Sequence, residues 1–155
     1  MSDAAAISPK LEDYLETIFN LLAERRVARV SEIADRMGVQ MPTVTGVLKH
    51  LARHGLVHYR PYQHVTLSPK GVEIARGMIR RHDVLKSFML DVLGLPEPTA
   101  EQDACGMEHA LSDETFERLN RFVRFVKASP RSGRRLIDGF RQSRRGRATR
   151  KRPTR

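Results

Sequence analysis

Apolar residues recur at helical spacing along most of the chain. After Ser8-Pro9, a pair that favours the start of a helix, they occupy every third or fourth position: Leu11, Tyr14, Leu15, Ile18 and Leu22. Two shorter helical patterns follow, one capped by Ser31 and running to Met37, the other running from Pro42 to Arg53. The turn Gly38-Val39-Gln40 joins them. Two short helices joined in this way indicate a helix-turn-helix.

The pattern changes to strand-like alternation directly after the second of these helices. Val57-His58-Tyr59 and Val65-Thr66-Leu67 alternate in polarity, and residues 60–64 form the bend between them. A hairpin in this position is typical of the wing of a DNA-binding domain. Residues 29–68 are therefore predicted to form a winged helix-turn-helix.

The rest of the chain returns to helical periodicity. Ser68-Pro69 begins a long apolar helix that ends before Gly94. Thr99 and Gln102 are a plausible capping box for the next helix, and Ser112 caps a last helix to about Lys127. We predict a mainly α protein in which an N-terminal winged helix-turn-helix (residues 1–71) precedes an all-helical dimerisation domain (72–129). Residues 130–155 are predicted to form a basic, disordered tail.

The net charge of +10 becomes informative once it is located. Residues 131–155 contain 11 Lys or Arg and one acid, whereas residues 1–130 are neutral overall. Within that body, residues 20–86 carry 12 basic and 5 acidic groups, so the predicted winged domain is the positive part. A basic section of this kind favours a polyanionic partner, and the hairpin points to double-stranded DNA.

The candidate DNA-binding residues lie on the second helix of the motif and on the wing. Hydroxyls and amides at a helix start suit phosphate oxygens, and cations on the same face add attraction. The residues are Gln40, Pro42, Thr43, Thr45, Gly46, Lys49, Arg53, Arg60 and His64. Gly46 costs about 1 kcal/mol of helix stability relative to alanine, which is easier to understand if the backbone approaches a DNA groove. The ordinary alternative is a solvated polar face on a helical hairpin.

The expected compartment is the cytoplasm. Lack of an apolar run of about 18–20 residues argues against a membrane span, and the first eight residues do not resemble a signal peptide. A single cysteine permits no internal disulfide, which suits a reducing environment.

That cysteine belongs to a group of possible metal ligands. Cys105, Glu108 and His109 stand at i, i+3 and i+4, so a helix places them on one face. Asp13 and Glu16 share a face of the first helix in the same way. Each has an ordinary explanation when taken singly: a carboxylate near a helix end, or a cysteine buried as a small apolar residue.

Together the segments resemble the DtxR/MntR family of metal-dependent transcriptional repressors. The matching stretches are Leu11-Glu12-Asp13-Tyr14-Leu15-Glu16, Met41-Pro42-Thr43-Val44-Thr45, Arg81-His82 and Asp103-Ala104-Cys105-Gly106-Met107-Glu108-His109-Ala110-Leu111-Ser112. The resemblance implies a homodimer that binds a palindromic operator and represses metal-uptake genes. It also implies the metal ligands Asp13, Glu16, His82, Cys105, Glu108 and His109.

The ligand set combines two branches of that family. Asp13 and Glu16 are similar to the manganese-sensing branch, whereas Cys105 is similar to the iron-sensing branch. Hard carboxylates favour Mn²⁺ and a thiolate favours softer ions, so the resemblance implies Mn²⁺ or Fe²⁺ as cofactor. Lys86 stands where the iron-sensing branch has a glutamate ligand of an ancillary site. The C-terminal SH3-like domain of longer members has no counterpart here.

Two other functions remain open at this point. One is a metal-independent winged-helix regulator that responds to a small molecule or to a protein partner. The other is a metallohydrolase with Glu108 as base, which is disfavoured because the ligands are dispersed and no phosphate or oxyanion loop accompanies them. We expect a regulator and not an enzyme.

Overall fold

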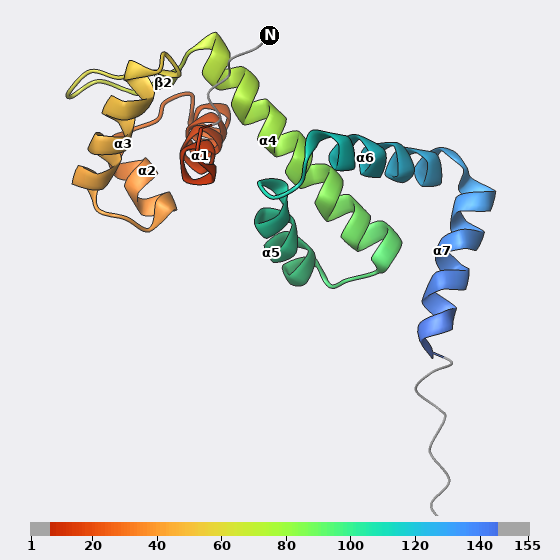
Figure 1. Cartoon of the computed structure of the whole chain (residues 1–155). Helices are drawn as coiled ribbons and strands as arrows, with labels where there is room; N and C mark the ends of the chain where they lie inside the picture. The colour runs from red at the N-terminus through yellow and green to blue at the C-terminus, as the bar shows by residue number, and fades with distance from the viewer. Residues whose placement is uncertain (1–6, 146–155) are drawn as a thin grey trace, which may run out of the picture. The chain divides into compact units, whose positions relative to one another are not determined.

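The computed structural model describes residues 7–145 and divides the chain into two compact units, Met1–Arg80 and Arg81–Arg155. The first contains α1 (Pro9–Arg25), α2 (Val30–Met37), α3 (Met41–Arg53), β1 (Val57–His58), β2 (Thr66–Leu67) and most of α4 (Pro69–Ser87). In Figure 1, α2 and α3 lie beside α1, with the hairpin at the end of α3. The predicted winged helix-turn-helix is confirmed.

One apolar core holds the first unit together. Tyr14, Leu15 and Ile18 of α1 are fully buried, as the helical spacing predicts. They pack with buried residues of α2, α3 and the hairpin, among them Ile33 and Leu48. Because each helix buries one stripe, the other faces of α3 and the wing stay available to a partner.

The local turns explain where the helices begin and end. Gly38 adopts a left-handed conformation with φ +63°, which ends α2 at little steric cost. The predicted cap of α2 is wrong by two positions, because Arg29 and not Ser31 is the cap residue. The backbone N–H of Arg29 donates to the Glu32 carboxylate at 3.1 Å, so Glu32 satisfies the cap in place of a hydroxyl.

The wing is a short antiparallel hairpin with Val57 opposite Leu67 and His58 opposite Thr66. An additional bridge joins Val65 to Ala28, whose carbonyl oxygen accepts from the Val65 N–H at 2.8 Å. The hairpin is thereby connected to the segment before α2. This bridge has no signal in the sequence pattern.

The start of α4 packs tightly on the turn before the wing. The hydroxyl of Ser68 accepts from the Gly71 N–H at 3.0 Å, which confirms the predicted helix start. A Cβ at Gly71 would lie 2.1 Å from the Leu56 carbonyl oxygen, so only glycine fits there.

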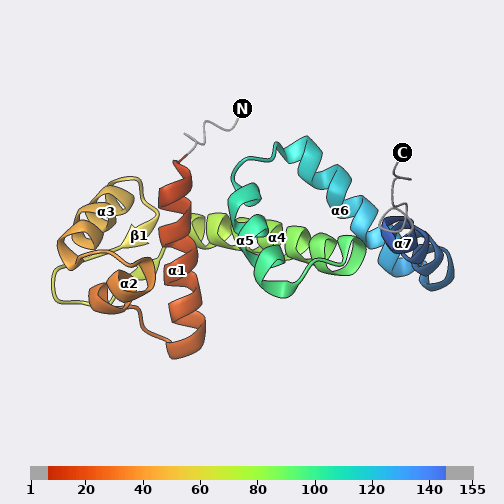
Figure 2. The same cartoon turned by 90° about the horizontal axis from the view of Figure 1, so that it is seen from below.

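The second unit consists of the end of α4, a π-helical segment η1 (Phe88–Leu93), α5 (Glu97–Glu108), α6 (Asp113–Ala128) and α7 (Pro130–Arg145). Figures 1 and 2 show α5 folded back beside the C-terminal part of α4. The helical segment ends at Gly94 as predicted, but its last six residues are π-helical and not α-helical. Within residues 7–145, no helix has both the length and the apolar character needed to cross a membrane.

Two local predictions about this unit need correction. The expected capping box of Thr99 and Gln102 is wrong, because α5 begins at Glu97, and Pro98 occupies its first turn. Ser112, by contrast, is confirmed as the cap of α6, since its hydroxyl accepts from the Thr115 N–H.

The predicted disorder after Ser129 is wrong for residues 130–145, which form α7. A Cβ at Gly133 would lie 2.1 Å from the Val126 carbonyl oxygen, so glycine permits the close corner between α6 and α7. Arg141 then donates to the carbonyl oxygens of Leu90 and Asp91 at 3.1 and 2.9 Å. The predicted tail beyond residue 145 lies outside the described residues.

Candidate nucleic-acid interface and metal centre

α3 occupies the position of a recognition helix. It buries Val44, Leu48 and Leu51 and leaves Gly46, Lys49 and Arg53 exposed on the opposite side. At its N-terminal end Gln40, Pro42 and Thr43 are also exposed. The positive N-terminal end of the α3 dipole is therefore accessible from solvent, as an anion-binding helix start requires.

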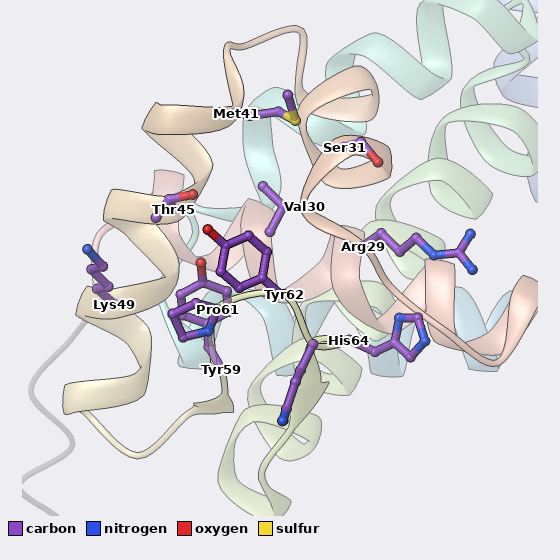
Figure 3. Close-up of a pocket in the computed structure, with 11 residues that line it drawn as sticks. Arg29, Val30, Ser31, Met41, Thr45, Lys49, Tyr59, Pro61, Tyr62 and His64 are labelled. Atoms are coloured by element: carbon purple, nitrogen blue, oxygen red, sulfur yellow. The ribbon is translucent and has the colours of Figure 1, made fainter.

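A groove of about 560 Å³ separates α3 from the beginning of α2 and is closed at one end by the wing. Figure 3 shows Thr45 and Lys49 on the α3 side, Val30 and Ser31 on the α2 side, and Tyr62 between them. Of the predicted DNA-binding residues, Thr45, Lys49 and His64 line this groove.

The remaining predicted residues of this surface line adjoining hollows. Gly46 and Arg53 share one with Lys49 and Tyr59. Arg60 and His64 line another, together with residues of both wing strands. The structure therefore brings the central and wing residues of the prediction onto one continuous side of the first unit, with positive charge along it.

Sequence reasoning missed two large exposed side chains of this surface, Tyr62 and Met41. Tyr62 is completely exposed and has φ +65°, a left-handed conformation that non-glycine residues rarely adopt. Met41 is 54% exposed at the beginning of α3 and lines the same groove. The available signal was the segment Pro61-Tyr62, because an aromatic residue at the tip of a predicted polar bend has no core to join.

In the second unit, His82 and His109 meet the carboxylate of Glu108. One oxygen of Glu108 lies 2.9 Å from His82 Nδ1 and the other lies 3.4 Å from His109 Nε2. The Glu108 side chain is only 2% exposed. Three of the predicted metal ligands are thus close together in this unit. Two imidazoles and a buried carboxylate are donors that suit a divalent transition metal.

Ionic contacts extend this cluster along α4 and α5. His82 Nε2 lies 3.2 Å from Glu101, and Lys86 lies 2.8 Å from Glu101 and 3.2 Å from Glu97. Burial lowers the pKa of the His82 imidazole, but the carboxylates of Glu108 and Glu101 outweigh it and hold the pKa above its ordinary value. The Lys86 ammonium holds the pKa of Glu101 below its usual range. Neither Lys86 nor Glu101 was predicted to contribute to the site.

The backbone that carries Glu108 is held by Arg81, the neighbour of His82. The Arg81 guanidinium donates to the carbonyl oxygens of Leu111 and Glu108 at 2.9 and 3.4 Å. It also pairs with the Asp113 carboxylate and lies 5.0 Å from the centre of the Phe116 ring. Arg81 thus fixes the end of α5, where Glu108 and His109 begin to leave the helix.

The other three predicted ligands lie on α5 and α1. Cys105 lies one turn before Glu108 and His109 on α5, and its side chain is exposed. Asp13 and Glu16 lie on α1 of the first unit, on either side of the buried Tyr14-Leu15 pair.

Two family models match consecutive parts of the chain. The one described as the iron dependent repressor N-terminal DNA binding domain matches residues 6–65. The one described as the iron dependent repressor metal binding and dimerisation domain matches residues 68–136. The two matches correspond to the winged part and the helical part of the fold.

Comparison with individual proteins agrees with these matches. An HTH-type transcriptional regulator of Methanocaldococcus jannaschii is 41% identical over 122 residues, which cover 78% of this chain and 98% of that protein. The HTH-type transcriptional regulator MntR of Lysinibacillus sphaericus is 33% identical over 123 residues, covering 79% of this chain and 88% of that protein.

A solved structure with a similar fold is a manganese-dependent transcriptional repressor in complex with manganese. It is 30% identical, has a TM-score of 0.66 and is matched over 74% of this chain. The chain spans about half the length of that structure, 53%. The chain therefore belongs to the iron dependent repressor family, whose members are metal-dependent, DNA-binding transcriptional regulators and not enzymes.

Proposed function

We propose that this chain is a cytoplasmic, homodimeric repressor whose binding to a palindromic operator is activated by Mn²⁺ or Fe²⁺ and which controls metal-uptake genes. The observation that carries the proposal is the buried Glu108 carboxylate with His82 and His109 against its two oxygens. A buried carboxylate needs compensating charge, and a divalent ion supplies it.

The residues fit such an ion. Imidazole nitrogens and carboxylate oxygens are the usual donors for divalent first-row metals. The proposed ligands are those of the sequence prediction: Asp13, Glu16, His82, Cys105, Glu108 and His109. When bound, the metal supplies concentrated positive charge to the four acidic or thiol groups among them.

The proposed regulation follows from the division of these ligands between two domains. Asp13 and Glu16 belong to the DNA-binding domain, and the other four belong to the metal-binding and dimerisation domain. An ion bound by both restricts the arrangement of the domains. Because a palindromic operator demands one separation of the two recognition helices, metal binding then favours the DNA-binding arrangement.

The proposed DNA contacts are those of the exposed side of α3 and the wing. Lys49, Arg53 and Arg60 contact phosphates, and the amides and hydroxyls at the start of α3 fix its position on the backbone. Gln40 and Thr45 are the candidates for contacts with base edges. The groove of Figure 3 supports this assignment because Thr45 and Lys49 line it together.

The test is DNA binding by the full chain with and without metal. An operator is first selected from random duplexes, and its affinity is then measured by fluorescence anisotropy with a chelator, with Mn²⁺ and, under anaerobic conditions, with Fe²⁺. We expect specific binding with metal and a large loss on chelation. Equal affinity in both conditions would contradict metal activation and favour a metal-independent regulator.

A second measurement decides between the two metals. Similar proteins named as manganese regulators support Mn²⁺, whereas the thiol of Cys105 supports Fe²⁺. Cys105→Glu is expected to shift preference towards Mn²⁺, and Asp13→Met towards Fe²⁺, in activation of operator binding. Glu73→Gln, an exposed change on α4, serves as the control. If neither variant shifts the preference, the assignment of these two positions is wrong.

A further inference from the structure

We propose that Lys86 and Glu101 are positioning residues that fix the imidazole ring of His82, so that its Nδ1 is presented to the metal beside Glu108. The proposal rests on the proposed function, because it takes His82 and Glu108 as ligands. It adds two residues, one on α4 and one on α5, that belong to neither the predicted ligand set nor the DNA-binding surface.

Four side chains form a continuous series of polar contacts. Lys86 Nζ lies 2.8 Å from one oxygen of Glu101, and the other oxygen of Glu101 lies 3.2 Å from His82 Nε2. His82 Nδ1 in turn lies 2.9 Å from Glu108. The two oxygens of Glu101 are therefore divided between the ammonium and the imidazole, and each nitrogen of His82 has its own carboxylate.

This arrangement corresponds to what a metal-ligating imidazole requires. One ring nitrogen must be free of its proton, while the other donates its N–H to an acceptor that sets the tautomer and the ring orientation. Glu101 is that acceptor for Nε2, which leaves Nδ1 for the metal.

Lys86 holds Glu101 in this orientation. Glu101 is 53% exposed, so its side chain has rotamer freedom that an isolated contact with His82 does not remove. His82 and Lys86 are one turn apart on α4, and Glu97 and Glu101 are one turn apart on α5. The ammonium of Lys86, between the two carboxylates, relieves their mutual repulsion and fixes Glu101 against His82.

The test measures metal binding by the full chain in the absence of DNA. Mn²⁺ affinity is measured by calorimetry, and the coordination sphere is recorded from the visible absorption of the Co²⁺-loaded protein. We expect Lys86→Met and Glu101→Ala to weaken Mn²⁺ binding by roughly 10–100-fold, the range for outer-shell partners. At saturation their Co²⁺ spectra are expected to match that of the wild type, because the ligands are unchanged.

Controls distinguish positioning from general damage. Lys86→Arg retains the cation and is expected to restore most of the affinity. Lys127→Met removes a lysine that pairs with Asp91 at 3.0 Å in the same unit, and it is expected to have no effect on Mn²⁺ binding. Far-UV circular dichroism of each variant checks that it folds.

Three outcomes would overturn the proposal, and they have different meanings. If Lys86→Met binds Mn²⁺ with wild-type affinity, Lys86 has no positioning role, and the proposed ligand set is unaffected. A Co²⁺ spectrum altered at saturation in Glu101→Ala makes Glu101 a ligand instead of a positioning residue. Wild-type affinity in His82→Ala removes His82 from the metal site, which also contradicts the ligand set of the proposed function.

Discussion

The Arg81 guanidinium donates a hydrogen bond of 2.9 Å to the backbone carbonyl oxygen of Leu111, thirty positions along the chain. The last carbonyl groups of a helix have no partner within it, and a cation is the favoured group to satisfy them. Through this contact α4 fixes the end of α5 and, with it, the backbone of Glu108. The stability of the second unit therefore depends on the shape of this side chain as well as on its charge.

Arg81→Lys is expected to lower the free energy of unfolding by about 1–3 kcal/mol, because lysine lacks the planar fork that reaches carbonyl groups and Asp113 together. Urea denaturation in the presence of chelator measures the change. Arg76→Lys is the matched control, since Arg76 is exposed and lies 5.9 Å from the Phe19 ring. Equal losses in the two variants would contradict the role assigned to Arg81.

Gly46→Ala is expected to raise the free energy of unfolding by about 1 kcal/mol and to weaken operator binding. A Cβ at this position of α3 has no atom within 4 Å, so the added methyl group meets only the DNA. Gly77→Ala, equally open on α4, is expected to stabilise the chain without affecting DNA binding. If Gly46→Ala binds the operator like the wild type, the α3 backbone does not approach the DNA closely at this position.

Tyr62→Gly separates stability from DNA binding at the wing. Glycine adopts φ +65° without strain, so the free energy of unfolding is not expected to fall. Operator affinity is expected to fall roughly three- to tenfold, equivalent to about 1 kcal/mol for one lost contact. Tyr62→Phe shows by anisotropy whether the hydroxyl makes that contact. Unchanged affinity in Tyr62→Gly would exclude the wing tip from the interface.

Tyr14→Phe is expected to leave the chain as stable as the wild type or to stabilise it by up to about 1 kcal/mol. Among the described residues, the buried hydroxyl of Tyr14 has no hydrogen-bond partner, and burial raises the pKa of this phenol. Thermal unfolding of the metal-free chain measures the effect. A clear loss of stability would mean that the Tyr14 hydroxyl makes a stabilising hydrogen bond in solution.

Asp91 is expected to contribute a pH-dependent part of the stability. Burial raises the pKa of its carboxyl, but the hydrogen bonds from Lys127 and Ser87 outweigh it and hold the pKa below the usual range. Its contribution is therefore present above the unfolded-state pKa of about 3.9 and is lost as the pH falls through the lower folded-state value. The difference in Tm between wild type and Asp91→Asn should shrink below pH 4. A difference independent of pH would contradict this.

The sequence was sufficient for the winged unit because its signals are local. The turn glycine and the apolar period agree from Ser8 to Leu67, and each helix and strand forms near its predicted limits, although the cap of α2 is Arg29 and not Ser31. Contacts that depend on distant partners were not predictable. The Ala28–Val65 bridge and the hydrogen bonds from Arg141 to the carbonyl oxygens of Leu90 and Asp91 join segments far apart in the sequence, so no local pattern indicates them.

The candidate site was predictable to a similar extent. Spacing on one helix joined Glu108 with His109, and the resemblance added His82, which the structure brings to the same carboxylate. Spacing did not reveal Lys86 and Glu101, because an ion pair between two helices depends on how they face each other. Tyr62 was missed for a different reason, since exposure of an aromatic side chain follows from a strained turn and not from periodicity.

The Lys86 ammonium lies within 3.2 Å of both Glu97 and Glu101. A dissolved ion occupies a site only as far as its concentration allows, whereas a charge carried on the chain itself has the same local concentration at all times. These two carboxylates are therefore neutralised equally whether the divalent metal is scarce or abundant in the cell. Whatever change in metal supply this protein registers, it does not register it as a change in the charge of that pair.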